Sequence, residues 1–170
     1  LWFHGWTFDG RHNFAGALWG RGNSWVTIVI PEFIELLDLP RDDALRVFLI
    51  DTLEAQVKAL AKVQAPSGLW RTILDDETSY EEAAASAGFA YGILKAVRKG
   101  YISKAYEAIG VAGAKAVRAH ISSEGELTQV SFGTPVFNTI QEYKDIPLTS
   151  MPFGQAMALL AMGEFMYRFI

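Results

Sequence analysis

A run of small residues in the middle of the chain constrains the fold more than any other feature of the sequence. Seven of the ten residues from 83 to 92 are alanine or glycine: Ala83, Ala84, Ala85, Ala87, Gly88, Ala90 and Gly92. Small side chains on a helix surface let neighbouring backbones approach closely. We therefore predict that the segment up to about Lys99 is an inner helix, packed on all sides, with Gly100 as its C-terminal break.

The start of this helix carries a capping pattern. Ser79-Tyr80-Glu81-Glu82 matches a capping box, in which a hydroxyl and a carboxylate bind the free amides of the first helical turn. This pattern favours a structural role for Glu82 over a functional one.

Four further helices are predicted by apolar residues that recur at intervals of three and four, and they cover residues 19–38, 44–63, 103–120 and 152–169. Pro31 should kink or split the first of them. Asp42 or Asp43 is a suitable N-cap for the second, whose buried stripe should include Phe48. Residues 127–132 predict a short strand and residues 136–150 a long loop.

About five helices in succession, joined alternately by short turns and long loops, favour antiparallel helical hairpins. The loops before the first, third and fifth helices hold most of the polar and aromatic residues. If the hairpins alternate in direction, these loops meet at one end of the molecule. We predict that the functional site lies at that end.

Composition narrows the class of protein. A chain of 170 residues with 51% hydrophobic residues is expected to fold as one domain with a sizeable core. Its net charge of −4, with no basic run, argues against nucleic acid as a partner. The absence of cysteine excludes disulfides, cysteine zinc sites and a thiol nucleophile.

The termini and hydropathy give further expectations. No run reaches the roughly 18 apolar residues that span a bilayer, so we expect a soluble protein without a membrane partner. The chain begins Leu1-Trp2-Phe3, without Met or a signal-like segment, and we expect that residue 1 is not the start of the gene product. The compartment stays open, with cytoplasm preferred over periplasm.

The densest set of ligand-binding side chains is the stretch Trp19-Gly20-Arg21-Gly22-Asn23-Ser24-Trp25. Arg21 and Trp25 are four residues apart and should project from one helix face. A guanidinium beside an indole suits an acidic sugar, because the first grips a carboxylate and the second stacks on a pyranose. A surface arginine resting on a core tryptophan explains the pattern equally well.

Several short motifs occur in a fixed order along the chain. They are His4-Gly5-Trp6, Trp19-Gly20-Arg21-Gly22-Asn23, Gly68-Leu69-Trp70-Arg71-Thr72-Ile73-Leu74-Asp75, Ser79-Tyr80-Glu81, Ser86-Ala87 and Ser131-Phe132-Gly133-Thr134. In this order, and over essentially the whole chain, the sequence resembles glycoside hydrolase families 88 and 105, the unsaturated glucuronyl and rhamnogalacturonyl hydrolases.

The resemblance implies an all-α fold that is part of an (α/α)6 toroid, built from antiparallel helical hairpins with a few short strands in loops. Residues 1–170 would form a single domain, the C-terminal portion of the six-hairpin barrel. The substrate implied is a 4,5-unsaturated uronic acid at the non-reducing end of lyase-generated oligosaccharides. A carboxylic acid protonates the enol-ether double bond, water adds, and the product opens.

Carried over by motif, the resemblance implies a substrate-binding set of His4, Arg21, Trp25, Gly133, Thr134 and Ser86. Arg21 would face the uronate carboxylate and His4 would lie in the pocket. From the residues alone, His4 is more simply a loop histidine satisfied by backbone. The family's catalytic Asp is expected upstream of residue 1, so no catalytic residue is assigned within this chain.

Two interpretations follow. Either the chain is part of an unsaturated glycuronyl hydrolase, inactive without its N-terminal half, or its helices close on a second copy as a non-catalytic sugar-binding or protein-interaction domain. Exposed inner-helix faces, especially the small-residue faces of the third and fifth helices, predict association. No repeat of 20–50 residues supports a solenoid scaffold, and three histidines are few for a sugar isomerase or epimerase. We expect no cofactor and no metal.

Overall fold

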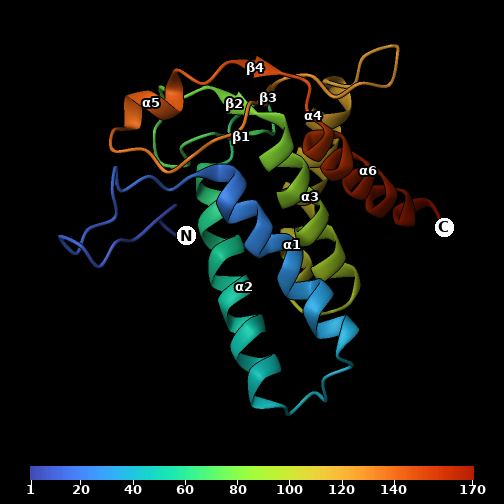
Figure 1. Cartoon of the computed structure of the whole chain (residues 1–170). Helices are drawn as coiled ribbons and strands as arrows, with labels where there is room; N and C mark the ends of the chain where they lie inside the picture. Colours follow the sequence, from blue (N-terminus) through green and yellow to red (C-terminus); the bar gives the residue numbers. More distant parts are fainter.

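Helix α3 (Ala83–Arg98) is the centre of the fold. In the computed structural model, which describes residues 1–170, every α3 residue from Ala83 to Ala96 is buried. Helix α3 packs against α1 (Gly20–Leu36), α4 (Glu107–Ala119) and α6 (Pro152–Met166) (Figure 1). The prediction of an inner helix is confirmed.

The small residues of α3 allow its close contact with α1. A methyl group at Gly92 would lie 2.2 Å from the carbonyl oxygen of Thr27, and one at Gly88 would lie 2.9 Å from the Ser24 side chain. These distances are far below van der Waals contact, so any larger residue would separate the two helices.

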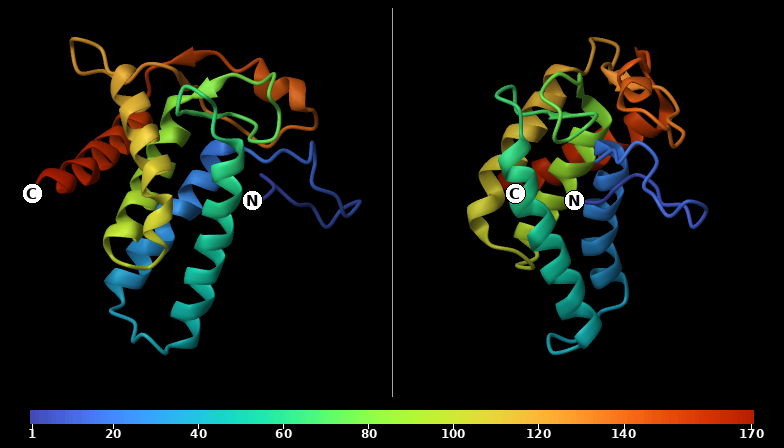
Figure 2. Two further views of the ribbon diagram at one scale, coloured as in Figure 1. Left: turned by 180° about the vertical axis from the view of Figure 1, so that it is seen from behind. Right: turned by 90° about the vertical axis from the view of Figure 1, so that its left-hand side faces the viewer.

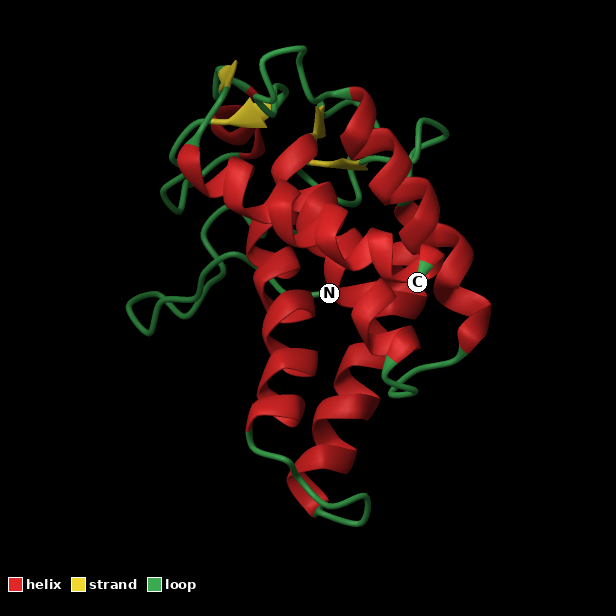
Figure 3. Cartoon of the chain, turned by 90° about the vertical axis from the view of Figure 1, so that its right-hand side faces the viewer, coloured by secondary structure: helices red, strands yellow, loops and turns green.

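The remaining elements complete a mostly helical chain (Figure 3). They are α2 (Ala44–Val63), α5 (Ile140–Lys144), and two 3-10 turns, Lys104–Tyr106 and Tyr167–Phe169. Strand β1 (Trp70–Arg71) pairs antiparallel with β2 (Glu81–Glu82), and β3 (Val130–Ser131) pairs antiparallel with β4 (Leu148–Thr149).

Local sequence signals predicted some boundaries well. Helix α2 has the predicted bounds, and Asp43 caps it by accepting hydrogen bonds from the amides of Leu45 and Arg46. The predicted capping box at Ser79 is wrong. The N-cap of α3 is Glu82 itself, whose carboxylate accepts from the Ala85 amide.

Two other predictions about local structure need correction. Helix α1 runs without interruption through Pro31, so the predicted split is wrong. Helix α5 lies inside the segment predicted as a long loop. It is held by a capping box between Thr139 and Glu142, which five residues are too short to reveal by apolar periodicity.

The loops before the helices meet at one end of the bundle, as predicted (Figure 1 and Figure 2). Trp19 forms a β-bridge with Ile73, and the Ala83 amide donates to the carbonyl of Gln129. The Ala15 amide donates to the carbonyl of Phe137. The three long loops are therefore joined to one another, while the α1–α2 and α3–α4 turns lie toward the opposite end.

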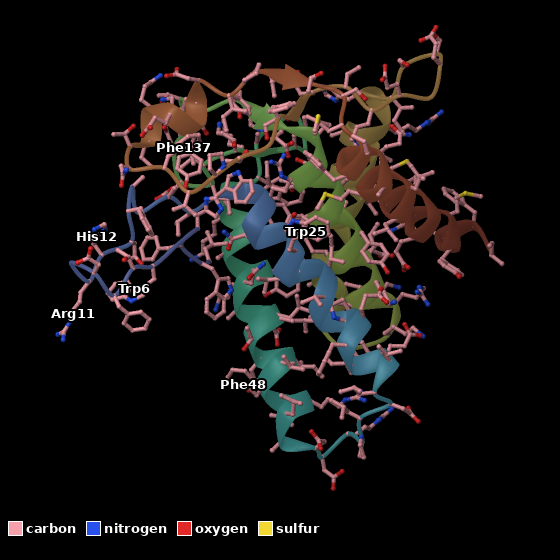
Figure 4. All side chains as sticks on the ribbon, viewed as in Figure 1. Trp6, Arg11, His12, Trp25, Phe48 and Phe137 are labelled. Carbon is pink, nitrogen blue, oxygen red and sulfur yellow. The ribbon has the colours of Figure 1, made fainter.

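Several apolar side chains remain exposed. Trp25, Val29 and Phe33 form an exposed stripe on α1, with 46%, 54% and 40% of their surface accessible. Phe48 is exposed on α2, where burial was predicted, and Figure 4 places it on the side of α2 that faces away from α1. Because α3 is buried from Ala83 to Ala96, the prediction that its small-residue face drives association is wrong. The same expectation for α6 stays a prediction, and the α1 stripe is a further open face.

A helix long and apolar enough to span a bilayer is absent from the structure.

Candidate functional site

Arg21 organises the end of the molecule at which the loops meet. It projects from the first turn of α1 and only 5% of it is exposed. Its Nη1 donates to the carbonyl oxygen and the Oγ of Ser131 at 2.8 and 2.9 Å. Its Nη2 donates to the Phe132 carbonyl and the Thr134 Oγ1, both at 3.0 Å. Arg21 therefore fixes the loop from Ser131 to Thr134.

Glu82 balances the charge of Arg21. Its Oε1 lies 3.5 Å from the Arg21 Nη1, and it is 1% exposed. The Ser131 amide donates to Oε1 at 3.0 Å and the Ala85 amide donates to Oε2. Burial raises the pKa of Glu82, and the Ala85 N–H and the guanidinium oppose that shift. Both carboxylate oxygens are therefore held by protein donors.

Two aromatic rings enclose the guanidinium. The Arg21 Cζ lies 4.9 Å from the ring centroid of Trp19 and 4.3 Å from that of Phe153. The sequence had predicted this guanidinium beside Trp25, and that pairing is wrong. Trp25 lies one turn further along α1 and is half exposed (Figure 4). Its indole is therefore accessible to a ligand or partner, but it does not stack on Arg21.

His4 packs against the Trp19 ring. Its imidazole centroid lies 4.1 Å from that of Trp19, and its Nδ1 lies 2.6 Å from the Tyr143 Oη. Its amide donates to the Ala17 carbonyl at 2.9 Å. Burial, and then the nearby charge of Arg21, lower the pKa of His4. His4 is therefore favoured in its neutral form.

The indole nitrogen of Trp19 has no hydrogen-bond partner. Its Nε1 is the only buried side-chain nitrogen or oxygen in the structure without a hydrogen-bond partner. A buried indole N–H normally finds an acceptor. Because Trp19 contacts both His4 and Arg21, this free donor belongs to the same cluster.

Apart from Trp25, the structure separates the predicted site residues into three groups. His4, Arg21 and Thr134 gather around Trp19 and the Ser131 loop. Gly133 is exposed in that loop. Ser86 is fully buried, where its hydroxyl donates to the Glu82 carbonyl and accepts from the Trp70 amide. The prediction that Ser86 lines the rim is therefore wrong.

The predicted role of Arg21 also changes. All four Nη hydrogens are paired with protein oxygens, and its charge is offset by Glu82. A direct two-pronged grip on a sugar carboxylate would require these bonds to be exchanged. By contrast, the amides of Gly133 and Thr134 make no hydrogen bond within the protein. The loop that Arg21 holds therefore presents two free donors.

Sequence reasoning missed several residues of this cluster. Trp19, Ser131, Tyr143 and Phe153 all make direct contacts in it, yet none was chosen as a site residue. Trp19 and Ser131 belong to the short motifs of the sequence, which was a signal for these two, whereas no motif pointed to Tyr143 or Phe153.

Asn23 has a structural role that the sequence did not reveal. Its side chain donates to the Trp2 carbonyl and accepts from the Trp2 amide. The Trp2 indole in turn donates to Gln56 on α2. These bonds fix the first residues against the helices and so place His4, whereas Trp6, Arg11 and His12 lie further out on the projecting loop (Figure 4).

A hollow of about 570 Å³ lies elsewhere, beside the start of α6. Its lining includes Glu124, Glu126, Ser150 and Gln155. With two carboxylates and no cation, this hollow would repel an acidic ligand. This hollow is therefore a poor site for a uronic acid.

Comparison with known proteins gives a consistent result. Residues 1–169 match the model of Glycosyl Hydrolase Family 88. The chain is 31% identical, over 168 residues, to the unsaturated rhamnogalacturonyl hydrolase YesR of Bacillus subtilis, covering 96% of this chain and 46% of that protein. The chain spans about half the length of the curated relatives it matches.

Solved structures agree with this match. A possible member of glycoside hydrolase family 105 from Salmonella enterica superposes with a TM-score of 0.97 at 57% identity, over all of this chain and 45% of that one. A family 105 glycoside hydrolase from C. acetobutylicum superposes with a TM-score of 0.80 at 26% identity, over 89% of this chain and 46% of that one.

Proposed function

The chain belongs to glycosyl hydrolase family 88, and from this membership we propose that it is part of an unsaturated glycuronyl hydrolase. The substrate is a 4,5-unsaturated uronic acid at the non-reducing end of lyase-generated oligosaccharides of the pectin or rhamnogalacturonan type. The observation that carries this proposal is the family match across residues 1–169, together with the likeness to a rhamnogalacturonyl hydrolase.

The proposed reaction is hydration of an enol ether. A carboxylic acid transfers a proton to the double bond, water adds to the neighbouring carbon, and the product opens and releases the next sugar. One acid in position is sufficient, in contrast to the two flanking carboxylates of an ordinary glycosidase.

The residues around Trp19 have distinct roles in this proposal. The free amides of Gly133 and Thr134 receive the uronate carboxylate, on the loop that Arg21 holds in place. His4 donates to a sugar oxygen, and the buried Trp19 ring packs against its imidazole. The exposed indole of Trp25 offers a face for stacking on a sugar ring.

The proton donor in this proposal lies outside residues 1–170. Glu82 is the carboxylate that contacts Arg21, and both its oxygens are held by amides in the protein interior. Such a group cannot reach a substrate. We further propose that residues 1–170 form the C-terminal portion of a six-hairpin ring, because related structures are about twice as long.

The test uses the full-length gene product and a lyase-generated unsaturated disaccharide. Loss of the ultraviolet absorbance of the conjugated double bond measures the reaction. We expect His4→Gln to lower kcat/KM by roughly 100-fold or more, as for loss of a group that acts on the transition state. The matched control is His12→Gln, which removes an exposed histidine of the same loop.

Two outcomes would contradict the proposal. If the wild-type enzyme leaves the absorbance unchanged, the activity is refuted. If His4→Gln and wild type act equally fast, His4 is not a site residue. Binding of the disaccharide without turnover by the full-length protein would favour the alternative, a non-catalytic sugar-binding domain.

A further inference from the structure

Tyr143 forms a hydrogen bond with the Nδ1 side of the His4 imidazole. It comes from α5, its side chain is 1% exposed, and its Oη lies 2.6 Å from the His4 Nδ1. The two rings meet edge to face, with their centroids 5.6 Å apart. Tyr143 is therefore a fixed partner of His4, although 139 positions separate the two residues.

The direction of this hydrogen bond follows from the other bonds of the hydroxyl. The Phe137 amide donates to the Tyr143 Oη at 3.2 Å, which uses one of its lone pairs. The phenolic proton then needs an acceptor, and the His4 Nδ1 is the only acceptor within hydrogen-bond distance. If His4 donated from Nδ1 instead, the proton of a buried phenol would have no partner, which is costly.

We infer that Tyr143 is a positioning residue that holds His4 as the neutral tautomer with its proton on Nε2. The Nε2 atom has no partner in the protein and is not among the buried unsatisfied atoms. Its N–H is therefore available to a ligand. This inference deepens the proposed function and rests on it for the identity of that ligand, a sugar oxygen of the uronic acid.

The surroundings of Tyr143 keep it in place. Its backbone carbonyl accepts from the Tyr80 hydroxyl at 3.2 Å, and the Phe137 ring packs edge-on with centroids 5.1 Å apart. Lys144, the next residue, pairs with Asp76 at 3.1 Å and ties α5 to the preceding loop. A hydroxyl fixed in this way can enforce one tautomer, since neither ring can turn to another partner.

The groups around His4 also favour its neutral form. Arg21, from α1, disfavours the imidazolium, as does burial. From α5, Tyr143 donates a proton and is itself uncharged, because burial raises its pKa further. Glu142 acts on Tyr143 and also raises that pKa. Both neighbouring elements therefore favour a neutral His4 that accepts at Nδ1.

The test is nitrogen NMR of this chain labelled with 15N-histidine. Only His4, His12 and His120 give signals, so the spectrum can be assigned by single substitutions. At neutral pH we expect the His4 Nε2 to carry the proton and Nδ1 to be unprotonated. A protonated Nδ1 in the wild type would overturn the inference without any substitution of Tyr143.

Tyr143→Phe is the second measurement, with Tyr106→Phe as the matched control outside the cluster. Loss of the phenol removes the hydrogen bond to the unprotonated Nδ1, so His4 should populate both tautomers and its pKa should rise. In the full-length enzyme, kcat should fall by roughly 10-fold to 100-fold, and the acid limb of the pH profile should move to higher pH. An unchanged His4 spectrum and pH profile in Tyr143→Phe would also overturn the inference.

The two readouts separate this inference from the proposed function. The tautomer is measured without substrate. An enzyme with no hydrolase activity but with His4 protonated at Nε2 would refute the function and leave the positioning role of Tyr143 standing. An active enzyme with His4 protonated at Nδ1 would support the function and refute the positioning role of Tyr143.

Discussion

The guanidinium of Arg21 and the carboxylate of Glu82 lie 3.5 Å apart across the junction of α1 and α3, and they are 5% and 1% exposed. The pair joins two helix starts to the Ser131 loop, because both side chains also bind Ser131. The candidate site is therefore built on a buried ion pair, with its ligand donors on the loop above.

Removing Arg21 should destabilise the fold. We expect Arg21→Met to lower the free energy of unfolding by about 3 kcal/mol or more, because it leaves the charge of Glu82 buried without its partner. Urea unfolding followed by circular dichroism measures this. Arg11→Met, in the exposed first loop, is the control and should change stability by less than about 0.5 kcal/mol.

A double variant measures the energetic coupling between Arg21 and Glu82. Arg21→Met combined with Glu82→Gln should cost less than the sum of the two single substitutions, since no unpaired charge remains. Strict additivity would show that the two side chains are not coupled.

The contact between α1 and α3 predicts a strong difference between two helical glycines. Gly92→Ala should cost about 1–3 kcal/mol or more, because its methyl group would lie 2.2 Å from the Thr27 carbonyl oxygen. Gly163→Ala, in α6, meets no atom within 4 Å and should stabilise the chain by about 0.5–1 kcal/mol. Thermal unfolding of both variants tests this, and equal effects would contradict the close contact.

Asp76 predicts a pH dependence of stability. Hydrogen bonds from the hydroxyl and amide of Thr78, and then Lys144, lower the pKa of Asp76 to about 2. Because the folded-state pKa lies below that of the unfolded chain, this stabilisation is present above about pH 4 and is lost as pH falls toward 2. Solvent screening reduces it to roughly 1 kcal/mol.

The corresponding experiment compares Asp76→Asn with Asp75→Asn, an exposed neighbour. Asp76→Asn should lower the free energy of unfolding by roughly 1 kcal/mol at pH 7 and progressively less from pH 4 to pH 3. A cost that stays constant over this range would mean that the charge of Asp76 contributes nothing.

The exposed stripe of Trp25, Val29 and Phe33 predicts association of this chain in isolation. Sedimentation should show a mass that rises with protein concentration, and Val29→Glu should reduce that rise. The control is Glu54→Gln, on α2. A well-behaved monomer at high concentration would contradict this prediction.

Much of the helical framework could be predicted from the sequence. The bounds of α2 and its cap at Asp43 follow from local signals, and the small residues of α3 predict its central position. These features depend on neighbours close in sequence, which periodicity reports directly. Phe48 shows the limit, because a helical period places it on the buried stripe although no element covers it.

The candidate site could be predicted only in part. The sequence pointed to His4 and Arg21 and to the end of the bundle at which they lie. It could not show that Arg21 binds Ser131, 110 positions later, or that Tyr143 holds His4. It also placed the guanidinium beside Trp25, since spacing on one helix says nothing of rings that arrive from other segments.

The amino-acid order alone thus determined the long helices, which of them is central and which family the chain resembles. Tertiary structure decided which donors stay free for a ligand and which are used to hold the loops. The physical reason is that a hydrogen-bonding group contributes to binding only if no protein partner satisfies it first, and those partners come from distant parts of the chain.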